Sequence, residues 1–409
     1  MQFAIDFILI IIYNRIIKNS GGIYVHILSG DDFLGVFGRR PEIHCFAPGR
    51  VNLIGDHTDY NGGRVFPCAI DLGIECMAAH RSDGRFSFCS LNFPEGGVVE
   101  RDGKAPVRSG NWSDYPMAVI RTFRQFGLLP KSGADFLFKG NLPDGAGLSS
   151  SAALEVLTGI VLRELWGFTL TPQQNAVLGQ FAENRFIGVN CGIMDQFASA
   201  MGRREHALLL DTYTLDVDYA PIDSSVASVV IVNSGVKHSL ASSAYNTRRR
   251  ECETALANLC GQMKIPSLCS LSNDEFDGLQ FCIADETCRR RARHAVSENV
   301  RTVEAAEALK TGKLEKFGRL MNESHISLRD DYEVSCAELD FLAESAWEMS
   351  FVYGARMTGG GFGGCTVNLV QRGFEQEFES KIRSAYTEKF GTDCETYSVT
   401  PGDGAHRIA

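Results

Sequence analysis

The order of apolar and polar residues predicts alternating strands and helices in the first half of the chain. Short runs rich in β-branched and aromatic residues predict strands at residues 43–55, 85–93, 134–139 and 206–211. Longer apolar runs predict helices at residues 115–126, 152–166, 171–189 and 194–201, with a loop at 101–106. The helix at 152–166 is apolar nearly all round, which is typical of a buried helix.

Beyond residue 211 the pattern changes. Strands are predicted at residues 228–236, 365–370 and 395–400, and helices at 239–259, 298–308, 337–349 and 374–390. A boundary near residue 210 therefore divides the chain into a domain at 22–210 and a domain at 211–409, preceded by an apolar extension at 1–21 whose role is open. We expect two mixed α/β domains that meet at a cleft.

Composition narrows the class of ligand. The 409 residues carry 50 acidic and 40 basic side chains, a formal net charge of −10, which does not favour nucleic acid or an anionic membrane. Two basic clusters, at residues 248–250 and 289–293, lie in mixed-charge helical segments and are predicted to be solvated faces. The 13 cysteines include no C-x-x-C pair, so we expect a reducing, cytoplasmic location.

The extension at 1–21 contains an apolar run at residues 7–12, preceded by Asp6 rather than by basic residues. This run is too short to span a bilayer and lacks the flanks of a signal peptide. We expect a start-site extension or a local helix packed on the body, without membrane contact. We also expect a monomer.

The stretch LPDGAGLSSSAALEV, residues 142–156, places two glycines and three serines before the buried helix. The start of a helix offers unpaired N–H groups and a positive dipole end, and Gly145 and Gly147 allow close approach of a ligand. One serine would suffice as a cap, so three in a row favour a phosphate site. The absence of lysine excludes a Walker A loop.

A second glycine-rich run, TGGGFGG at residues 358–364, satisfies G-x-G-x-x-G. A dinucleotide fingerprint needs a strand before the loop and a helix after it. The pattern here predicts a helix before the run and a strand after it. We therefore expect close backbone approach to another segment, with the phosphate loop as the first candidate.

Polar residues gather in two further segments. The run GRVNLIGDHTDYNGG, residues 49–63, carries Asp56, His57, Thr58 and Asp59, which suit a ligand with many hydroxyls, although such a turn can also be purely structural. Asp195 lies in the predicted first turn of a short helix, where a carboxylate is also stabilised by the dipole alone.

These motifs together resemble the galactokinases, within the GHMP family of sugar and small-metabolite kinases. The likeness rests on GRVNLIGDHTDYNGG, GAGLSSSAA and GGGFGG, and extends through AENRFIGVNCGIMDQ (182–196) and NSGVKHSLASSAYNTRRREC (233–252). It covers most of the chain from about residue 22. It implies a two-domain GHMP-kinase fold, with a ribosomal protein S5-like N-terminal domain, a ferredoxin-like C-terminal domain and the site in the cleft between them. The implied reaction is phosphorylation of galactose at C1 by ATP with Mg²⁺, the first committed step of galactose catabolism.

The resemblance also implies roles for individual residues. Asp195 would face the C1 hydroxyl and accept its proton, and Arg50 would keep Asp195 ionised and offset charge on the transferred group. Sugar recognition falls to Asp56, His57, Thr58, Asp59, Gly192 and Tyr245. ATP binding falls to Gly145, Ala146, Gly147, Leu148, Ser149, Ser150 and Ser151, with Ser87 and Asn92 as a first hypothesis for part of the adenosine site.

Ser151 and Glu183 are the implied Mg²⁺ ligands, with Ser150 as a competitor for the serine role. Helical spacing alone places Glu183 away from the face formed by Val177, Leu178 and Phe181, and would make it solvated. Galactokinases usually carry Glu where this chain has Asp56, so we expect a modest change in sugar affinity. Two alternatives stay open: a kinase for another sugar, such as N-acetylgalactosamine or arabinose, and a catalytically weak galactose sensor.

Overall fold

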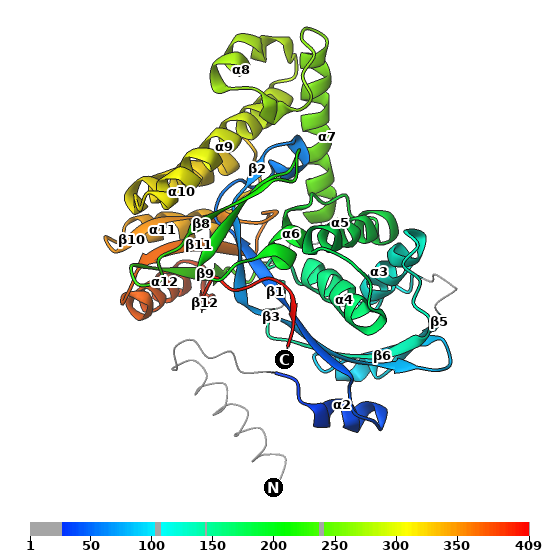
Figure 1. Ribbon diagram of the computed structural model, residues 1–409. Helices are drawn as coiled ribbons and strands as arrows, with labels where there is room; N and C mark the ends of the chain where they lie inside the picture. The colour runs from blue at the N-terminus through cyan, green and yellow to red at the C-terminus, as the bar shows by residue number, and fades with distance from the viewer. Residues whose placement is uncertain (1–26, 103–107, 144, 237–240, 409) are drawn as a thin grey trace.

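A computed structural model describes residues 27–102, 108–143, 145–236 and 241–408. The extension predicted at 1–21 and most of the loop predicted at 101–106 lie outside these ranges. Figure 1 shows an elongated molecule in which a pair of long helices, α7 (Ala241–Cys260) and α9 (Glu286–Lys310), extends from a body built on β-sheets.

The first sheet is mostly antiparallel and carries the N-terminal half of the chain. Its six strands run in the order β13-β1-β3-β6-β4-β5, and only the β4–β6 pair is parallel. The strands are β1 (Ile43–Asn52), β3 (Pro67–Arg81), β4 (Arg85–Ser90), β5 (Val99–Asp102), β6 (Gly133–Gly140) and β13 (His406–Arg407). Because β13 pairs with β1, the last strand lies in the same sheet as the first strand.

Helices α3 (Asp114–Gln125), α4 (Ser150–Trp166) and α5 (Pro172–Ala182) pack on this sheet. Phe88 and Phe136 stack at 5.2 Å between ring centroids, and Leu157 and Ile160 of α4 cover the same core. Each such side chain contributes about 1.5–3 kcal/mol by burial. Thr171 caps α5 in a capping box before Pro172.

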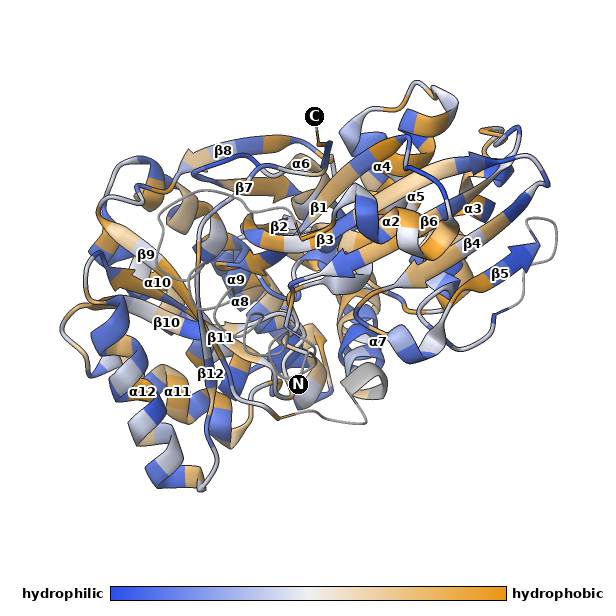
Figure 2. Cartoon of the chain, turned by 90° about the horizontal axis from the view of Figure 1, so that it is seen from below, coloured by the Kyte–Doolittle hydropathy of each residue, from blue (hydrophilic) through white to orange (hydrophobic). Residues whose placement is uncertain are grey.

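The second sheet has four antiparallel strands in the order β10-β11-β9-β12. They are β9 (Ala227–Asn233), β10 (Val352–Thr358), β11 (Cys365–Gln371) and β12 (Glu395–Val399). Helices α11 (Ala337–Trp347) and α12 (Glu375–Phe390) cover one face, and α9 with α10 (Leu314–Asp330) covers the other. Figure 2 shows α12 with hydrophilic and hydrophobic bands in turn, as a helix half in solvent requires.

A third sheet, with three strands in the order β2-β7-β8, completes the body of the protein. The strands are β2 (Arg64–Val65), β7 (His206–Asp211) and β8 (Val217–Pro221), and the helix that matters for the site is α6 (Met194–Met201). Helix α2 (Gly30–Phe37) packs on the far face of the large sheet, and α8 (Asn273–Leu279) lies beside α9.

The structure corrects three expectations. The glycine-rich run follows a strand, β10, and not a helix, so it is the turn of a β-hairpin. Arg101, assigned to a loop, lies in β5, where it pairs with Asp114. The long strand β3 and the helix α10 were not predicted, because β3 is interrupted by charged residues and α10 is amphipathic rather than wholly apolar.

Candidate functional site

A cleft of about 410 Å³ collects half of the site residues selected from the sequence. It lies where the turn after β1, the start of α4, the end of α5, the start of α6, helix α7 and the β10–β11 turn meet. Nine of the predicted residues line it: Arg50, Asp56, His57, Asp59, Ser151, Glu183, Gly192, Asp195 and Tyr245.

Asp195 and Arg50 form the centre of the cleft. Arg50 Nε donates to Asp195 Oδ1 over 2.8 Å, and the side chains are 5% and 32% exposed, respectively. The other carboxylate oxygen, Oδ2, accepts from the hydroxyl of Ser149 over 2.6 Å. Asp195 is the second residue of α6, so its carboxylate lies at the positive end of the helix dipole.

The glycine and serine loop reaches α4 through left-handed backbone. Gly145, Gly147 and Ser149 have φ of 68°, 69° and 62°, and Ser149 is the residue before the helix. Ala146 and Leu148 point inward and are buried, whereas the two glycines are exposed. The loop thus presents backbone N–H groups outward and fixes itself by the apolar side chains between them.

The β10–β11 turn packs against this loop, as the sequence predicted. The thiol of Cys365 donates to the carbonyl of Ala146 over 2.9 Å. A Cβ at Gly359 would lie 3.6 Å from the carbonyl oxygen of Gly147, the same carbonyl that Arg50 Nη1 meets at 2.8 Å. The two glycine-rich segments, more than 200 residues apart in sequence, are therefore in contact, and Gly359 and Gly360 of the second one line the cleft.

Glu183 lies inside the protein, so its assignment to a solvated face by helical spacing is wrong. Its carboxylate accepts from Gln196 Nε2 over 2.8 Å and from the Cys191 thiol over 3.2 Å. The spacing argument chose the wrong face, since Val177 is 36% exposed and α5 is buried on the sides that contact α4 and α6. Burial and the charge of Asp195 raise the pKa of Glu183, while hydrogen bonds from Cys191, Ser151 and Gln196 oppose the shift.

Two residues that the sequence did not single out lie behind Glu183. Glu155, on the buried face of α4, is fully enclosed, and Gln196 Nε2 donates to it over 3.0 Å as well as to Glu183. Burial and the charge of Glu183 raise the pKa of Glu155 well above its ordinary value, which favours the protonated form. The sequence signal for Glu155 is a glutamate within an otherwise apolar helix. Such a glutamate indicates a buried carboxyl group, which needs a polar partner.

Asp59 and Gly192 meet at the opposite side of the cleft. A Cβ at Gly192 would lie 1.6 Å from Asp59 Oδ2, so only glycine leaves room for this carboxylate. Burial, with the charges of Asp195 and Asp56 nearby, raises the pKa of Asp59 to about 7. Three carboxyl groups in one cleft repel each other when charged, which favours a ligand that donates hydroxyl protons to them.

Aromatic rings close the cleft beside Asp59. His57 packs against Tyr332 at 4.7 Å and Tyr245 at 5.6 Å between ring centroids. Its Nδ1 is 2.8 Å from the hydroxyl of Tyr60, which in turn is 2.8 Å from the hydroxyl of Tyr332. Burial lowers the pKa of His57 to about 3, so the imidazole is neutral and can exchange hydrogen bonds with a neutral ligand.

Asp56 is bound to a partner from the second half of the chain. Its Oδ2 lies 2.6 Å from Arg356 Nη2, and both side chains are almost completely buried. Burial raises the pKa of Asp56, and Arg356 opposes the shift. Arg356 belongs to β10, so this pair joins the β1 turn to the second sheet.

Nine predicted site residues do not line this cleft. Six of them belong to the loop at residues 145–150, and the other three are Thr58, Ser87 and Asn92. The hydroxyl of Thr58 is used within the turn, where it lies 2.8 Å and 2.7 Å from the carbonyl oxygens of Gly55 and Arg64. Ser87 is fully buried and accepts from Arg81 Nη1. The amide of Asn92 pairs with the backbone of Gly140 in both directions. The ligand roles of these last three residues stay predictions that this geometry does not support.

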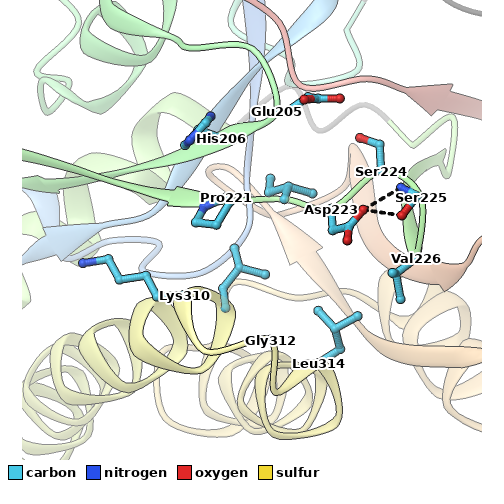
Figure 3. Close-up of a pocket in the computed structure, with 12 residues that line it drawn as sticks. Glu205, His206, Pro221, Asp223, Ser224, Ser225, Val226, Lys310, Gly312 and Leu314 are labelled. Atoms are coloured by element: carbon cyan, nitrogen blue, oxygen red, sulfur yellow. Dashed lines mark hydrogen bonds between the residues drawn. The ribbon is translucent and has the colours of Figure 1, made fainter.

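A larger hollow of about 590 Å³ lies elsewhere, between the β8–β9 connection and the α9–α10 turn. Figure 3 shows Lys310, Gly312 and Leu314 on one side, with Glu205 and His206 across from them. Asp223, also on its wall, is already occupied by the amide and hydroxyl of Ser225. Polar groups do not converge here as they do around Asp195, so volume alone does not mark the site.

Comparison with known proteins decides the family. Family models match in three places: the galactokinase galactose-binding signature at residues 31–80, the GHMP kinase N-terminal domain at 114–203 and the C-terminal domain at 305–388. The chain is 47% identical to the galactokinase of Clostridium beijerinckii over 92% of its length and 97% of the relative. The chain belongs to the galactokinase family. The Bacillus subtilis galactokinase is 45% identical over the same shares.

Solved structures agree. The structure of Lactococcus lactis galactokinase complexed with galactose matches with a TM-score of 0.90 and 42% identity, covering 93% of this chain and 98% of that one. The mevalonate kinase of Methanococcus jannaschii matches with a TM-score of 0.61 at 19% identity, which shows the shared fold alone. The predicted GHMP-kinase fold is therefore confirmed. Within the described residues, none of the helices is long and apolar enough to cross a membrane.

The galactokinase motifs account for most of the lining but not for all of it. Arg108, Asn246 and Cys191 also line the cleft and were not selected from the sequence. Cys191 precedes Gly192 and Asn246 follows Tyr245 in the sequence. Both lie within the galactokinase-like segments, but only their neighbours were selected as site residues. Arg108 follows a segment with no motif, and only the tertiary structure brings it to the cleft.

Proposed function

We propose that this protein transfers the γ-phosphoryl group of ATP to the C1 hydroxyl of galactose, giving galactose 1-phosphate and ADP. The observation that carries the proposal is the position of Asp195, held between Arg50 and the serine loop inside a cleft rich in carboxyl groups. The likeness to galactokinases over 92% of the chain supports the choice of sugar.

The polar wall of the cleft suits a sugar. Asp56, Asp59 and the backbone at Gly192 offer acceptors to hydroxyl groups, and Tyr245 and His57 give flat surfaces beside them. With a pKa of about 7, Asp59 can accept from a hydroxyl as the carboxylate or donate to one as the acid. Several modest hydrogen bonds, rather than one strong contact, would hold the sugar.

Asp195 is the proposed proton acceptor. As the C1 oxygen forms its bond to the γ-phosphorus and the bond from that phosphorus to the bridging oxygen breaks, the hydroxyl proton passes to Asp195 and ADP departs. The hydroxyl of Ser149 occupies Oδ2, the oxygen not paired with Arg50, and must turn away to admit the sugar. Arg50 stays in place because it is also bound to the carbonyl of Gly147, and its charge can stabilise the transferred group.

The loop 145–151 and the first turn of α4 are the proposed phosphate cradle. Their exposed backbone N–H groups and the dipole of α4 attract anions without a lysine. Among the three serines, Ser149 is bound to Asp195 and Ser150 points to solvent, whereas Ser151 lines the cleft and bonds to Glu183. This supports Ser151 as the serine of the metal site.

The residues at Ser151 and Glu183 fit a magnesium ion. Within the described residues no cluster of three or more His, Cys, Asp and Glu side chains forms a protein-only metal site. Magnesium in kinases instead takes one or two protein oxygens together with phosphate oxygens, which a hydroxyl and a buried carboxylate provide. When bound, the ion supplies charge neutralisation for the phosphates. Glu183 is already oriented for this by Gln196 and Cys191.

A panel of sugars tests the proposal. ADP formation is measured with galactose, N-acetylgalactosamine, arabinose, glucose and galacturonate, each with ATP and magnesium. We expect the highest kcat/KM with galactose. A higher value with another sugar would make the protein a kinase for that sugar, and no ADP with any of them would support the sensor alternative. We also propose a cytoplasmic location, supported by all 13 cysteines being free thiols.

A further inference from the structure

The sequence predicts that the two basic clusters are solvated faces, but one arginine of each cluster is largely buried. Arg291, from the second cluster, is 2% exposed, and Arg248, from the first, is 14% exposed. Helices α7 and α9 lie side by side, and Arg248 from the first cluster and Arg290 and Arg291 from the second reach a common target. That target is the turn at residues 330–334, which follows α10.

The turn is held mainly through its carbonyl groups. Arg248 donates to the carbonyls of Tyr332 and Glu333 at 2.7 Å and 2.8 Å. Arg291 donates to the carbonyl of Asp331 and to the Glu333 carboxylate, both at 2.6 Å, while Glu251 balances its charge at 2.9 Å. Arg290 adds a bond to the carbonyl of Asp330.

Backbone geometry explains why so many donors are needed. Glu333 has a φ of 53°, a left-handed conformation that side-chain-bearing residues rarely adopt. Such a conformation is strained and persists only where surrounding contacts fix it. The guanidinium groups of Arg248 and Arg291 supply those contacts, in a fork geometry that lysine cannot reproduce.

The turn contacts two walls of the cleft, through Tyr332 in its middle and Val334 at its end. Tyr332 is fully buried, and it stacks on His57 and bonds to Tyr60. Two residues later the carbonyl of Val334 accepts from the backbone N–H of Phe362 at 2.6 Å, in the middle of the glycine-rich turn. A Cβ at Gly361 would lie 2.2 Å from that same carbonyl, so the two segments are in direct backbone contact.

We propose that Arg291 and Arg248 are positioning residues for the reaction, which fix the turn 330–334 and through it both the aromatic wall and the glycine-rich turn of the cleft. Neither guanidinium needs to touch a substrate. The kinetic part of this inference rests on the proposed function, whereas the structural part does not.

The test compares Arg291→Met with Arg289→Met. Methionine keeps much of the apolar stem and removes the charge. Arg289 is a matched control, since it belongs to the same cluster on α9 but binds the carbonyls of Gln280 and Ile283 instead of the turn. We expect Arg291→Met to raise the KM for galactose by roughly tenfold to a hundredfold, the range for a small displacement of a site. Arg289→Met should stay within about twofold of the parent protein.

Hydrogen exchange of the substrate-free protein gives a readout independent of activity. We expect the amides at residues 334 and 359–364 to lose protection by at least about tenfold in Arg291→Met and to stay unchanged in Arg289→Met. Glu333→Gln, which keeps the shape of the side chain, serves if Arg291→Met does not fold, and should give the same changes in smaller measure. Arg291→Lys should restore less than half of the lost protection.

Unchanged exchange in residues 359–364 together with an unchanged KM would overturn the proposal. So would equal losses in both methionine variants, because that would indicate a general loss of stability. If the parent protein does not phosphorylate galactose, the proposed function fails, yet the exchange experiment still decides whether the arginines hold the turn.

Discussion

Replacement of Asp195 separates binding from chemistry. Asp195→Asn keeps the size of the side chain and an oxygen that can accept from Arg50 Nε, now 2.8 Å away. It removes the ability to accept a proton. General base catalysis contributes about 10²–10⁴-fold, so we expect kcat to fall by about a thousandfold, or about 4 kcal/mol in activation free energy.

Galactose binding should change far less. Asp56, His57 and Asp59 line the cleft as well as Asp195, so one lost contact out of several is expected to weaken the dissociation constant by no more than about tenfold, or about 1.4 kcal/mol. Isothermal titration measures binding, and a coupled assay for ADP measures turnover.

Asp195→Ala adds a second effect. It leaves Arg50, with a side chain 5% exposed, bound only to the carbonyl of Gly147. We expect a loss of about 1–2 kcal/mol in unfolding free energy, below the figure for a fully buried pair because Asp195 is 32% exposed. Asp274 lies in the first turn of α8 and outside the cleft, so Asp274→Ala controls for removal of a negative charge from the first turn of a helix.

Two results would refute this reasoning. If Asp195→Asn keeps kcat within about tenfold of the parent protein, Asp195 is not the proton acceptor. If it loses galactose binding by more than about a hundredfold, Asp195 acts mainly as a binding residue.

Three further predictions concern the rest of the cleft. Glu183→Gln should raise the magnesium concentration for half-maximal activity by about tenfold, since a neutral amide is a poorer ligand, and an unchanged titration would place the metal elsewhere. Because the folded-state pKa of Asp59 is about 7 and the unfolded value is near 3.8, the folded protein binds more protons between these limits. Stability should therefore fall as pH rises from 4 to 7, by up to about 1.4 kcal/mol per pH unit, and Asp59→Asn should flatten this slope in urea unfolding. Gly192→Ala should displace the Asp59 carboxylate and raise the KM for galactose by at least about tenfold, whereas Gly96→Ala, whose added Cβ meets nothing within 4 Å, should not; equal KM values would contradict the clash.

The local motifs in the sequence predicted the residues of the site better than they predicted the arrangement of strands and helices. The exposed glycines before an apolar helix indicated a phosphate loop because glycine backbone and helix termini have local, sequence-encoded properties. The same locality explains the correct placement of Asp195 in the first turn of a helix. The family's motifs then located the cleft residues, nine of which the structure brings together.

Periodicity failed where several elements cover one segment. Helical spacing predicts one apolar face on α5 and places Glu183 on the opposite, solvated face. In the structure more than one face of α5 is buried, and Glu183 is buried with it. Arg291 is predicted to be solvated because a run of charged residues on a helix usually faces solvent. No feature of the local sequence indicates that a turn 40 residues away accepts hydrogen bonds from its guanidinium.

The sequence by itself therefore determined the family and the polar character of the cleft, and it predicted the phosphate loop, since these depend on residue types at fixed short spacing. Tertiary structure alone decided which carboxylate is paired, neutral or poised near pH 7, because desolvation and neighbouring charges depend on what packs around each group. It also decided that the glycine-rich run is a hairpin turn against the phosphate loop, because strand β10 forms only when β11 is there to pair with it.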